Sequence, residues 1–187
     1  NEPKIAFPTP YPLPWGSKVV TGEDVSMYMG FWGYTEILKM DGYPNAAKAW
    51  SHWLHGDGSP RTLDLNRMYA EDPATASIFP KEAIAACKAV KKMSPGWHRV
   101  VSGSAWRLGF EHPNWQKGPG TICVHGVADA CRTGGGCIVD LTVWFWDPFF
   151  FGYQSSGPGH LHPAGWCHDY MNKASDRRIV RVPNVTL

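Results

Sequence analysis

The chain has 187 residues, of which 43% are hydrophobic and 18% are charged, and its formal net charge is +2. This composition predicts one folded domain, with or without an appended arm, and excludes a disordered protein. The small charge, with no Lys/Arg cluster longer than a pair, argues against a nucleic-acid-binding protein. No secretory signal or membrane-spanning segment is recognisable. The chain begins at Asn1 without methionine, which fits a processed protein or a piece of a longer one.

Residues 1–20 are predicted to form an extended arm, because five prolines fall within the first 18 residues. Residues 21–187 are expected to form a single α+β catalytic domain, with a helical part over 21–95 and a β-rich part over 96–187. We expect the N-terminal helices to pack on an antiparallel β-sheet or half-barrel.

Capping residues and hydrophobic spacing set the predicted helices. Thr21 and the acids after it favour a helix start, the FWG at 31–33 interrupts it, and Pro44 suits the first turn of a clearer helix. The predicted helical segments are 22–29, 35–40, 44–55, 80–93 and 165–175. The predicted strands are 97–110, 120–131, 136–151 and 177–187.

Five cysteines indicate an oxidising place of action. Cys123 and either Cys131 or Cys137 flank a Gly-rich turn and could pair across a hairpin. The spacing contains no CxxC pair, which argues against a zinc knuckle. We therefore expect one or two disulfides and at least one free thiol, such as Cys87 on a predicted helix.

The segment from Cys137 to Tyr170 carries the most suggestive chemistry. Asp147 is a single carboxylate in an aromatic strand, and such an acid is costly to bury unless it is paired or used. It could hold a divalent cation, Mg²⁺ in the first place, or act as a base. His160 or His162, which follow a Gly/Pro/Ser turn, could then move the proton. The alternative is a structural Asp-Pro turn followed by solvent-facing histidines.

Asp140 lies seven residues before Asp147, so a regular strand would place the two carboxylates on opposite faces. A β-bulge could bring them to one face and make Asp140 catalytic. Otherwise Asp140 is a charge at a strand edge. Arg61 follows the Gly-Asp-Gly turn at 56–58 and could meet a carboxylate or a phosphate, although the turn itself fits a helix cap.

The order of the elements and two segments resemble the catalytic domain of the colicin M family. The first segment, AWSHWLHGDGSPRTLDL at 49–65, is similar to a family helix that ends in Leu-Trp-Gly-x-Gly and leads into a segment with Arg. The second, RRIVRVPNVTL at 177–187, resembles the family's final strand. The resemblance spans roughly residues 46–187, and it is most specific in 52–65 and in the last strand.

The resemblance implies an antibacterial toxin that hydrolyses lipid II, the lipid-linked peptidoglycan precursor, at the membrane surface. The products are the lipid alcohol and a pyrophosphorylated sugar-peptide, and a divalent cation, typically magnesium, supports the reaction. It also implies secretion or delivery into the periplasm of target bacteria, and an immunity protein as a partner. We expect the chain to be monomeric.

The family motif is Asp-x-Tyr-Asp, five residues, then His-Arg. Trp146-Asp147 stands where Tyr-Asp would be, Trp144 stands at the first Asp, and Tyr153 begins the pair that replaces His-Arg. The candidate catalytic residues are Asp147, His162, His160 and Asp140; the candidate substrate-binding residues are Trp144, Trp146, Tyr153 and Arg61; and Asp147 is also the candidate metal ligand.

Two other functions fit the same residues. The ten Trp could belong to a secreted glycan- or lipid-binding module without catalysis, in which the His/Asp cluster is structural. The second alternative is an unrelated metal-dependent hydrolase that uses His160, His162 and His168 as ligands. Loss of ligand binding on Trp substitution without any turnover would favour the first, and stoichiometric zinc would favour the second.

Overall fold

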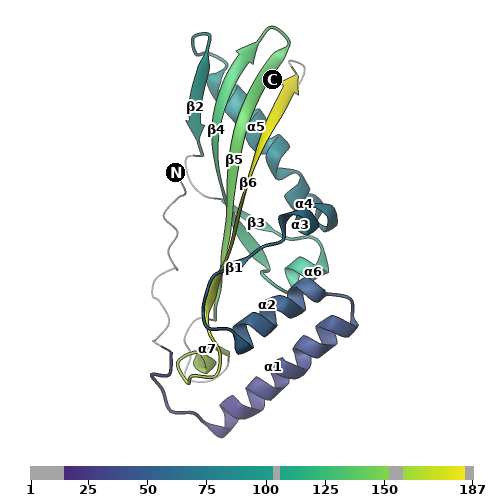
Figure 1. Cartoon of the computed structure of the whole chain (residues 1–187), viewed down its shortest axis with the longest axis vertical. Helices are drawn as coiled ribbons and strands as arrows, with labels where there is room; N and C mark the ends of the chain where they lie inside the picture. Colours follow the sequence, from purple (N-terminus) through teal and green to yellow (C-terminus); the bar gives the residue numbers. More distant parts are fainter. Residues whose placement is uncertain (1–14, 103–105, 152–157, 184–187) are drawn as a thin grey trace.

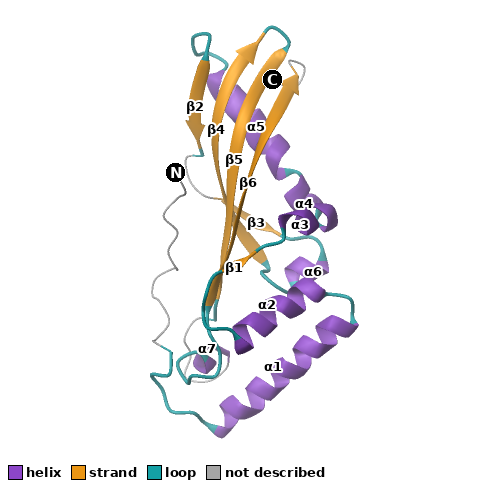
Figure 2. Cartoon of the chain, in the orientation of Figure 1, coloured by secondary structure: helices purple, strands orange, loops and turns teal. Residues whose placement is uncertain are grey.

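The computed structural model describes residues 15–102, 106–151 and 158–183, and it is an α+β protein, as predicted (Figure 1). A long twisted sheet runs along the molecule, one helix covers one of its faces, and two further helices lie beneath one end (Figure 2). Most of the predicted arm lies outside the described residues. Its last part runs along the loop after β5, since the backbone N–H groups of Gly16 and Lys18 donate to the carbonyls of His162 and Pro163.

The helices are α1 (Gly22–Met40), α2 (Pro44–His55), α3 (Leu65–Glu71), α4 (Pro73–Ala76), α5 (Ile78–Val90), α6 (Pro113–Gln116) and α7 (Pro158–Leu161). The start of α1 at Thr21 is confirmed by a capping box with Asp24. The predicted interruption at 31–33 is wrong, because α1 continues through it. Phe31 stacks on Trp50 at a centroid distance of 5.1 Å, and this packing outweighs the local propensity. None of the helices in the described ranges is long and apolar enough to cross a membrane.

The strands are β1 (Arg61–Thr62), β2 (Trp97–Val101), β3 (Trp106–Gly109), β4 (Thr121–Thr133), β5 (Gly136–Phe149) and β6 (Tyr170–Pro183). Their order is β1-β6-β5-β4-β2, and β3 also pairs with β4. All pairs are antiparallel except β1 with β6. The predicted helix at 165–175 is wrong, because β6 begins at Tyr170 and its first residues pair with the end of β5.

Helix α5 packs on one face of the sheet and forms the larger apolar core with it. A disulfide joins Cys87 of α5 to Cys137 of β5. One disulfide was expected, but the predicted pairs of Cys123 with Cys131 or Cys137 are wrong, and Cys87 is not free. The alternation of β4 explains this result, because Cys123 and Cys131 lie on the open face, the face of the sheet that α5 does not cover.

The base of the molecule is the end where α1, α2 and α7 meet the end of β5 and the start of β6 (Figure 1). A second apolar cluster fills it, separate from the core under α5. Trp53, Leu161 and Tyr170 are fully buried there, and Phe149 packs against them. The segment from Cys137 to Tyr170 therefore ends inside the base.

Candidate functional site

Asp147 lies near the end of β5 on the face that points into the protein. Only 8% of the residue is exposed. Asn172, its register partner on β6, donates from Nδ2 to Asp147 Oδ2 at 3.3 Å. Burial raises the pKa of Asp147 to about 8, although the bond from Asn172 and the charge of Arg107 act in the opposite direction. The group is therefore a neutral carboxylic acid at pH 7.

Arg61 reaches the same place from β1. Its Nη1 donates to Asn172 Oδ1 at 3.1 Å, so Asn172 connects the guanidinium to Asp147. Its Nη2 donates to Asn45 Oδ1 at 2.5 Å. Sequence analysis predicted that Arg61 meets a carboxylate or a phosphate, and the structure brings it to Asp147 through one amide. The parallel pairing of β1 with β6 makes this approach possible.

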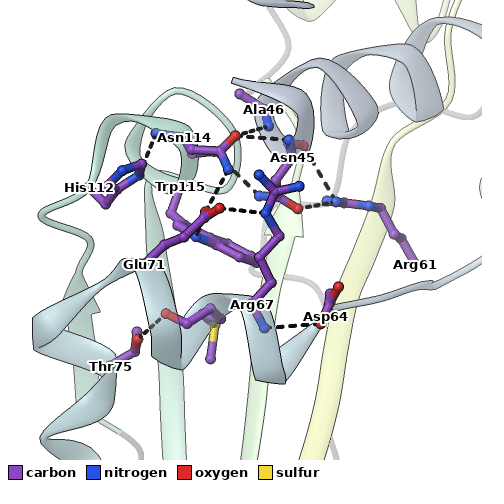
Figure 3. Close-up of polar contacts among 11 residues, drawn as sticks. Asn45, Ala46, Arg61, Asp64, Arg67, Glu71, Thr75, His112, Asn114 and Trp115 are labelled. Carbon is purple, nitrogen blue, oxygen red and sulfur yellow. Dashed lines mark hydrogen bonds and ion pairs between the residues drawn. The ribbon is translucent and has the colours of Figure 1, made fainter. Parts of the chain in front are cut away.

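A network of amides and carboxylates holds Arg61 in position (Figure 3). Asn114 Oδ1 accepts the backbone N–H groups of Asn45 and Ala46 at 2.8 and 3.2 Å, and so caps α2. Glu71 accepts hydrogen bonds from Asn114, Trp115 and Arg67. Burial alone would raise the pKa of Glu71, but these bonds outweigh it and leave the pKa lowered.

Sequence analysis missed the two amides that matter most for this network, Asn172 and Asn114. Both are 0% exposed, and each joins segments that are far apart in the chain. A buried Asn has no spacing or composition signal, because its role depends entirely on the tertiary pairing. Asn172 lies in 165–175, which was predicted to be helical, so its pairing with the end of β5 was not expected.

His160 is the first of the two candidate histidines. Its Nδ1 lies 2.7 Å from Asp24 Oδ1, and both residues are buried. Burial would raise the pKa of Asp24, but the bonds from His160 and Thr21 outweigh it and lower the pKa. The pair connects α7 to the first turn of α1. His160 is thus placed as a contact between helices, and this contact does not bring it to Asp147.

His162 belongs to a different pair. The backbone N–H of Asp169 donates to His162 Nδ1 at 3.0 Å, and Asp169 Oδ1 accepts from Trp53 Nε1 at 3.0 Å. Asp169 Oδ2 is buried without a hydrogen-bond partner among the described residues, 3.9 Å from His162 Nδ1. Burial raises the pKa of Asp169 to about 6 against the bond from Trp53. Burial, followed by the charge of His168, lowers the pKa of His162.

The third histidine, His168, stacks on Trp15 at a centroid distance of 4.6 Å. Its ring lies 6.1 Å from that of His162, in an edge-to-face arrangement. The three imidazoles therefore point to different partners. Across the described part of the chain, no group of three His, Cys, Asp or Glu side chains could hold a metal ion. The neighbours of Asp147 are amides and guanidinium groups, so these residues do not fit a resident divalent cation.

Asp140 lies on the open face of the sheet, opposite to Asp147. The register of β5 with β6 is continuous from Gly136 to Phe149, so no bulge intervenes. The separation of seven residues therefore places the two carboxyl groups on opposite faces of the sheet. Arg177 donates to both carboxylate oxygens of Asp140, at 2.8 and 2.5 Å. These bonds lower the pKa of Asp140. The structure does not bring Asp140 to the candidate site.

Two of the three aromatic candidates belong to the part of the chain that the structure describes. Trp144 and Trp146 are half-buried on the open face, and Trp144 borders a groove of about 590 Å³ beside β1 and β6. Tyr153 lies outside the described residues. A second pocket, of about 370 Å³, begins at Pro148 directly after Asp147. Its aromatic walls are Tyr34, Trp50, Phe149, Phe150 and Phe151.

Comparisons with known proteins leave the family unassigned. No protein-family model matches the chain, and no curated protein matches it. The solved structure of pectocin M2 is similar over 88% of this chain and 64% of its own chain, with a TM-score of 0.36 and 13% sequence identity. This chain thus corresponds to less than two thirds of that protein. A likeness of this size does not place the chain in a family.

Proposed function

We propose that this chain is an antibacterial toxin domain that hydrolyses lipid II at the bond between the lipid alcohol and the pyrophosphate. The observation that carries the proposal is the buried neutral acid Asp147, joined through Asn172 to the cation Arg61. An aromatic pocket begins one residue after the acid. Cleavage of a lipid-linked pyrophosphate needs a proton donor, positive charge and an apolar surface. The first two are connected by hydrogen bonds through Asn172, and the third begins at the residue that follows Asp147 in β5.

The resemblance to the colicin M family supports the same proposal. Its two most specific parts are 52–65 and the last strand. Arg61 comes from the first part, and β6, which ends in the second part, carries Asn172. Arg61 and Asn172 are partners in the register of β1 with β6. Segments about 110 residues apart in the sequence thus contribute to one cluster around Asp147.

The protonation state of Asp147 revises its expected role. A carboxyl with a pKa of about 8 is a poor base and a poor cation ligand at pH 7, but it can donate a proton. In the proposed reaction, water attacks the phosphorus and releases one proton to solvent, the bond from phosphorus to the lipid oxygen breaks, and Asp147 gives its proton to that oxygen. The lipid alcohol leaves, and Asp147 is later reprotonated from solvent. Arg61 offsets the charge that develops on the phosphate oxygens.

The remaining parts of the proposal rest on the resemblance. We derive no step through magnesium, because the residues around Asp147 do not fit a resident ion, and the assay below therefore varies the metal. The disulfide between Cys87 and Cys137 supports action in an oxidising compartment such as the periplasm. An immunity protein would be the partner in the producing cell.

The test is hydrolysis of purified lipid II in detergent, with and without magnesium, followed by chromatography and mass spectrometry of the products. Wild type should release undecaprenol, and Asp147→Asn should lose about 100-fold or more of this activity, as expected for a lost general acid. The matched control is Asp140→Asn, which removes a carboxylate from the opposite face of the same strand and should stay within about twofold. No release by the folded wild type, at any metal concentration, would refute lipid II hydrolysis.

A second candidate function is a glycan- or lipid-binding module without catalysis. The specific observation is the mixed lining of the aromatic pocket, where Gln116 and Lys117 stand beside Trp50 and Phe151. Aromatic rings with a few polar groups suit a sugar or a lipid headgroup. Binding of lipid II that Trp50→Ala weakens, in the absence of any turnover, would favour this function over hydrolysis.

A further inference from the structure

The end of the molecule opposite to the base, which we call the distal tip, is built from three segments. They are the turn from α5 into β2 (residues 91–99), the turn from β4 into β5 (132–136) and the end of β6 (177–183) (Figure 1). Arg132 Nη1 donates to the backbone carbonyl of Lys91 at 2.5 Å and joins the first two segments.

The distal tip concentrates positive charge. The sequence has no Asp or Glu over 83–110, 130–139 and 177–187, the stretches that contain the three segments. These stretches carry most of the cations of this end: Lys88, Lys91, Lys92, Arg99, Arg132, Arg177 and Arg181, whereas Arg178 lies over the rings of Tyr69 and Phe79 near the other end of α5. Because the whole chain has a net charge of only +2, the rest of the molecule is net acidic. The acidic partners at this end, from neighbouring positions, are Asp129, Asp140 and Asp176.

Exposed apolar side chains stand among these cations. Trp97 is 58% exposed and Met93 is 43% exposed. Trp97 lies opposite Cys131, Cys131 opposite Ile138, and Ile138 opposite Arg181, so Trp97 and Arg181 share one cross-strand row. An exposed tryptophan thus lies in the same row as a cation three strands away, at the end of the long axis of the molecule.

We propose that the distal tip docks on the surface of an anionic phospholipid bilayer, with Trp97 and Met93 entering the headgroup region. Charge complementarity selects an anionic occupant, since a Lys or Arg near such a surface contributes about 1 kcal/mol. Trp is the residue type that prefers the membrane interface. A projecting end made of turns suits a fluid surface that adapts to it, whereas a rigid partner would need a matching cavity.

This docking goes beyond the proposed function and is separable from it. β5 runs from Gly136 at the tip to Asp147, and 11 residues at 3.3 Å each give about 36 Å. Substitutions at the tip should therefore leave the hydrolysis of detergent-solubilised lipid II unchanged. Docking without hydrolysis would refute only the proposed function, and hydrolysis without docking would refute only this proposal.

The test is sedimentation of the protein with vesicles of phosphatidylcholine alone or mixed equally with phosphatidylglycerol. Wild type should sediment with the mixed vesicles only, and about 0.5 M NaCl should release it, because salt screens exposed charges. The triple variant Lys91→Glu, Lys92→Glu, Arg181→Glu should lose at least about 100-fold in affinity. Trp97→Ala should lose a smaller part of the affinity for these vesicles, and this loss should not depend on salt.

Two matched controls keep the test decisive. Lys18→Glu, Lys48→Glu and Lys81→Glu together make the same change in net charge at exposed positions away from the tip, and should lose little affinity. Trp32→Ala removes a Trp that is 47% exposed on α1 and should bind like wild type. Failure of wild type to sediment, equal binding to neutral vesicles, or equal losses in the two triple variants would overturn the proposal. Thermal unfolding of each variant verifies that it is folded.

Discussion

The two apolar clusters of this protein differ in what they bury. The cluster between α5 and the sheet consists of aliphatic and aromatic side chains and is cross-linked by the disulfide between Cys87 and Cys137. The cluster at the base also surrounds ionisable groups, including Asp24, Asp147 and Asp169. Each of these carboxyl groups was moved out of water and needs a partner or a proton. The upper cluster can therefore supply stability without titrating, whereas the base must respond to pH.

Within the base, burial has different outcomes for the protonation of the three carboxyl groups. Asp24 stays ionised, because His160 and Thr21 bond to it. Asp147 and Asp169 have raised pKa values of about 8 and about 6, because burial outweighs their few bonds. Asp24 therefore has the properties of a structural carboxylate, whereas Asp147 and Asp169 have those of a proton donor. The comparison thus supports the proposed proton donation by Asp147 and argues against such a role for the better-bonded Asp24.

Removing the disulfide should have the largest effect on stability. The double variant Cys87→Ala, Cys137→Ala should lower the free energy of unfolding by about 2–5 kcal/mol in a urea titration, since it removes the cross-link of the upper cluster. Lipid II hydrolysis per folded molecule should not change, because the cross-link lies far from the base. If the folded double variant also lost specific activity, the two clusters would not be independent.

The pH dependence of stability should come from the base. Because its pKa rises from 3.8 to about 8 on folding, Asp147 binds a proton in the native state that the unfolded chain has released. The contribution of Asp147 to stability is therefore complete below about pH 4 and declines as the pH rises toward 8, by at most about 1.4 kcal/mol per pH unit. Asp147→Asn should flatten this decline in urea titrations from pH 5 to 8.

The control for this slope is Asp140→Asn. The pKa of Asp140 is lowered, so its contribution is present above the unfolded pKa and is lost only as the pH falls through the lower folded value. That window lies below pH 5, and the slope above it should remain as in wild type. If Asp140→Asn flattened the slope as well, the titration could not be assigned to the base.

A smaller effect is expected from Trp53→Phe. Trp53 is fully buried, and its Nε1 donates to Asp169. The substitution keeps most of the ring packing but removes the hydrogen bond from Nε1 to the carboxyl, so the free energy of unfolding should fall by about 1–3 kcal/mol. The pKa of Asp169 should rise above about 6, because the one bond that lowers it is lost. An unchanged carboxyl titration by NMR would argue against this contact.

The smallest effect should come from the open face. Arg177→Gln removes both bonds to Asp140, yet the Arg177 side chain is 70% exposed and solvent screens the pair. The urea midpoint of unfolding should stay within the error of the wild-type measurement. A loss as large as that caused by Trp53→Phe would mean that this ion pair on the open face stabilises the protein as much as the buried contact in the base.

The sequence predicted the α+β class, α2, α5 and most of the strands, because periodicity and capping residues are local signals. It also named Asp147, a lone acid in an aromatic strand, and Arg61 as candidates, and the structure connects these two through Asn172; their role in a site stays a prediction. It could not predict the course of 165–175, where pairing with β5 overrides a mixed local pattern, or the partner of Cys137, which depends on the face of each strand. The roles of Asn172 and Asn114 depend on contacts across more than 60 residues and leave no local pattern.

The most direct test of the account is the pKa of the Asp147 carboxyl itself. Carbon-13 NMR of protein labelled at the aspartate carboxyl carbons, with Asp147→Asn to assign the signal, follows this group from pH 3 to 10. We predict a titration midpoint of about 8 for this carboxyl, as expected for an acid that is neutral at pH 7 and can donate a proton. A midpoint near 4 would mean that Asp147 is an ordinary carboxylate, and would contradict its proposed role as the proton donor.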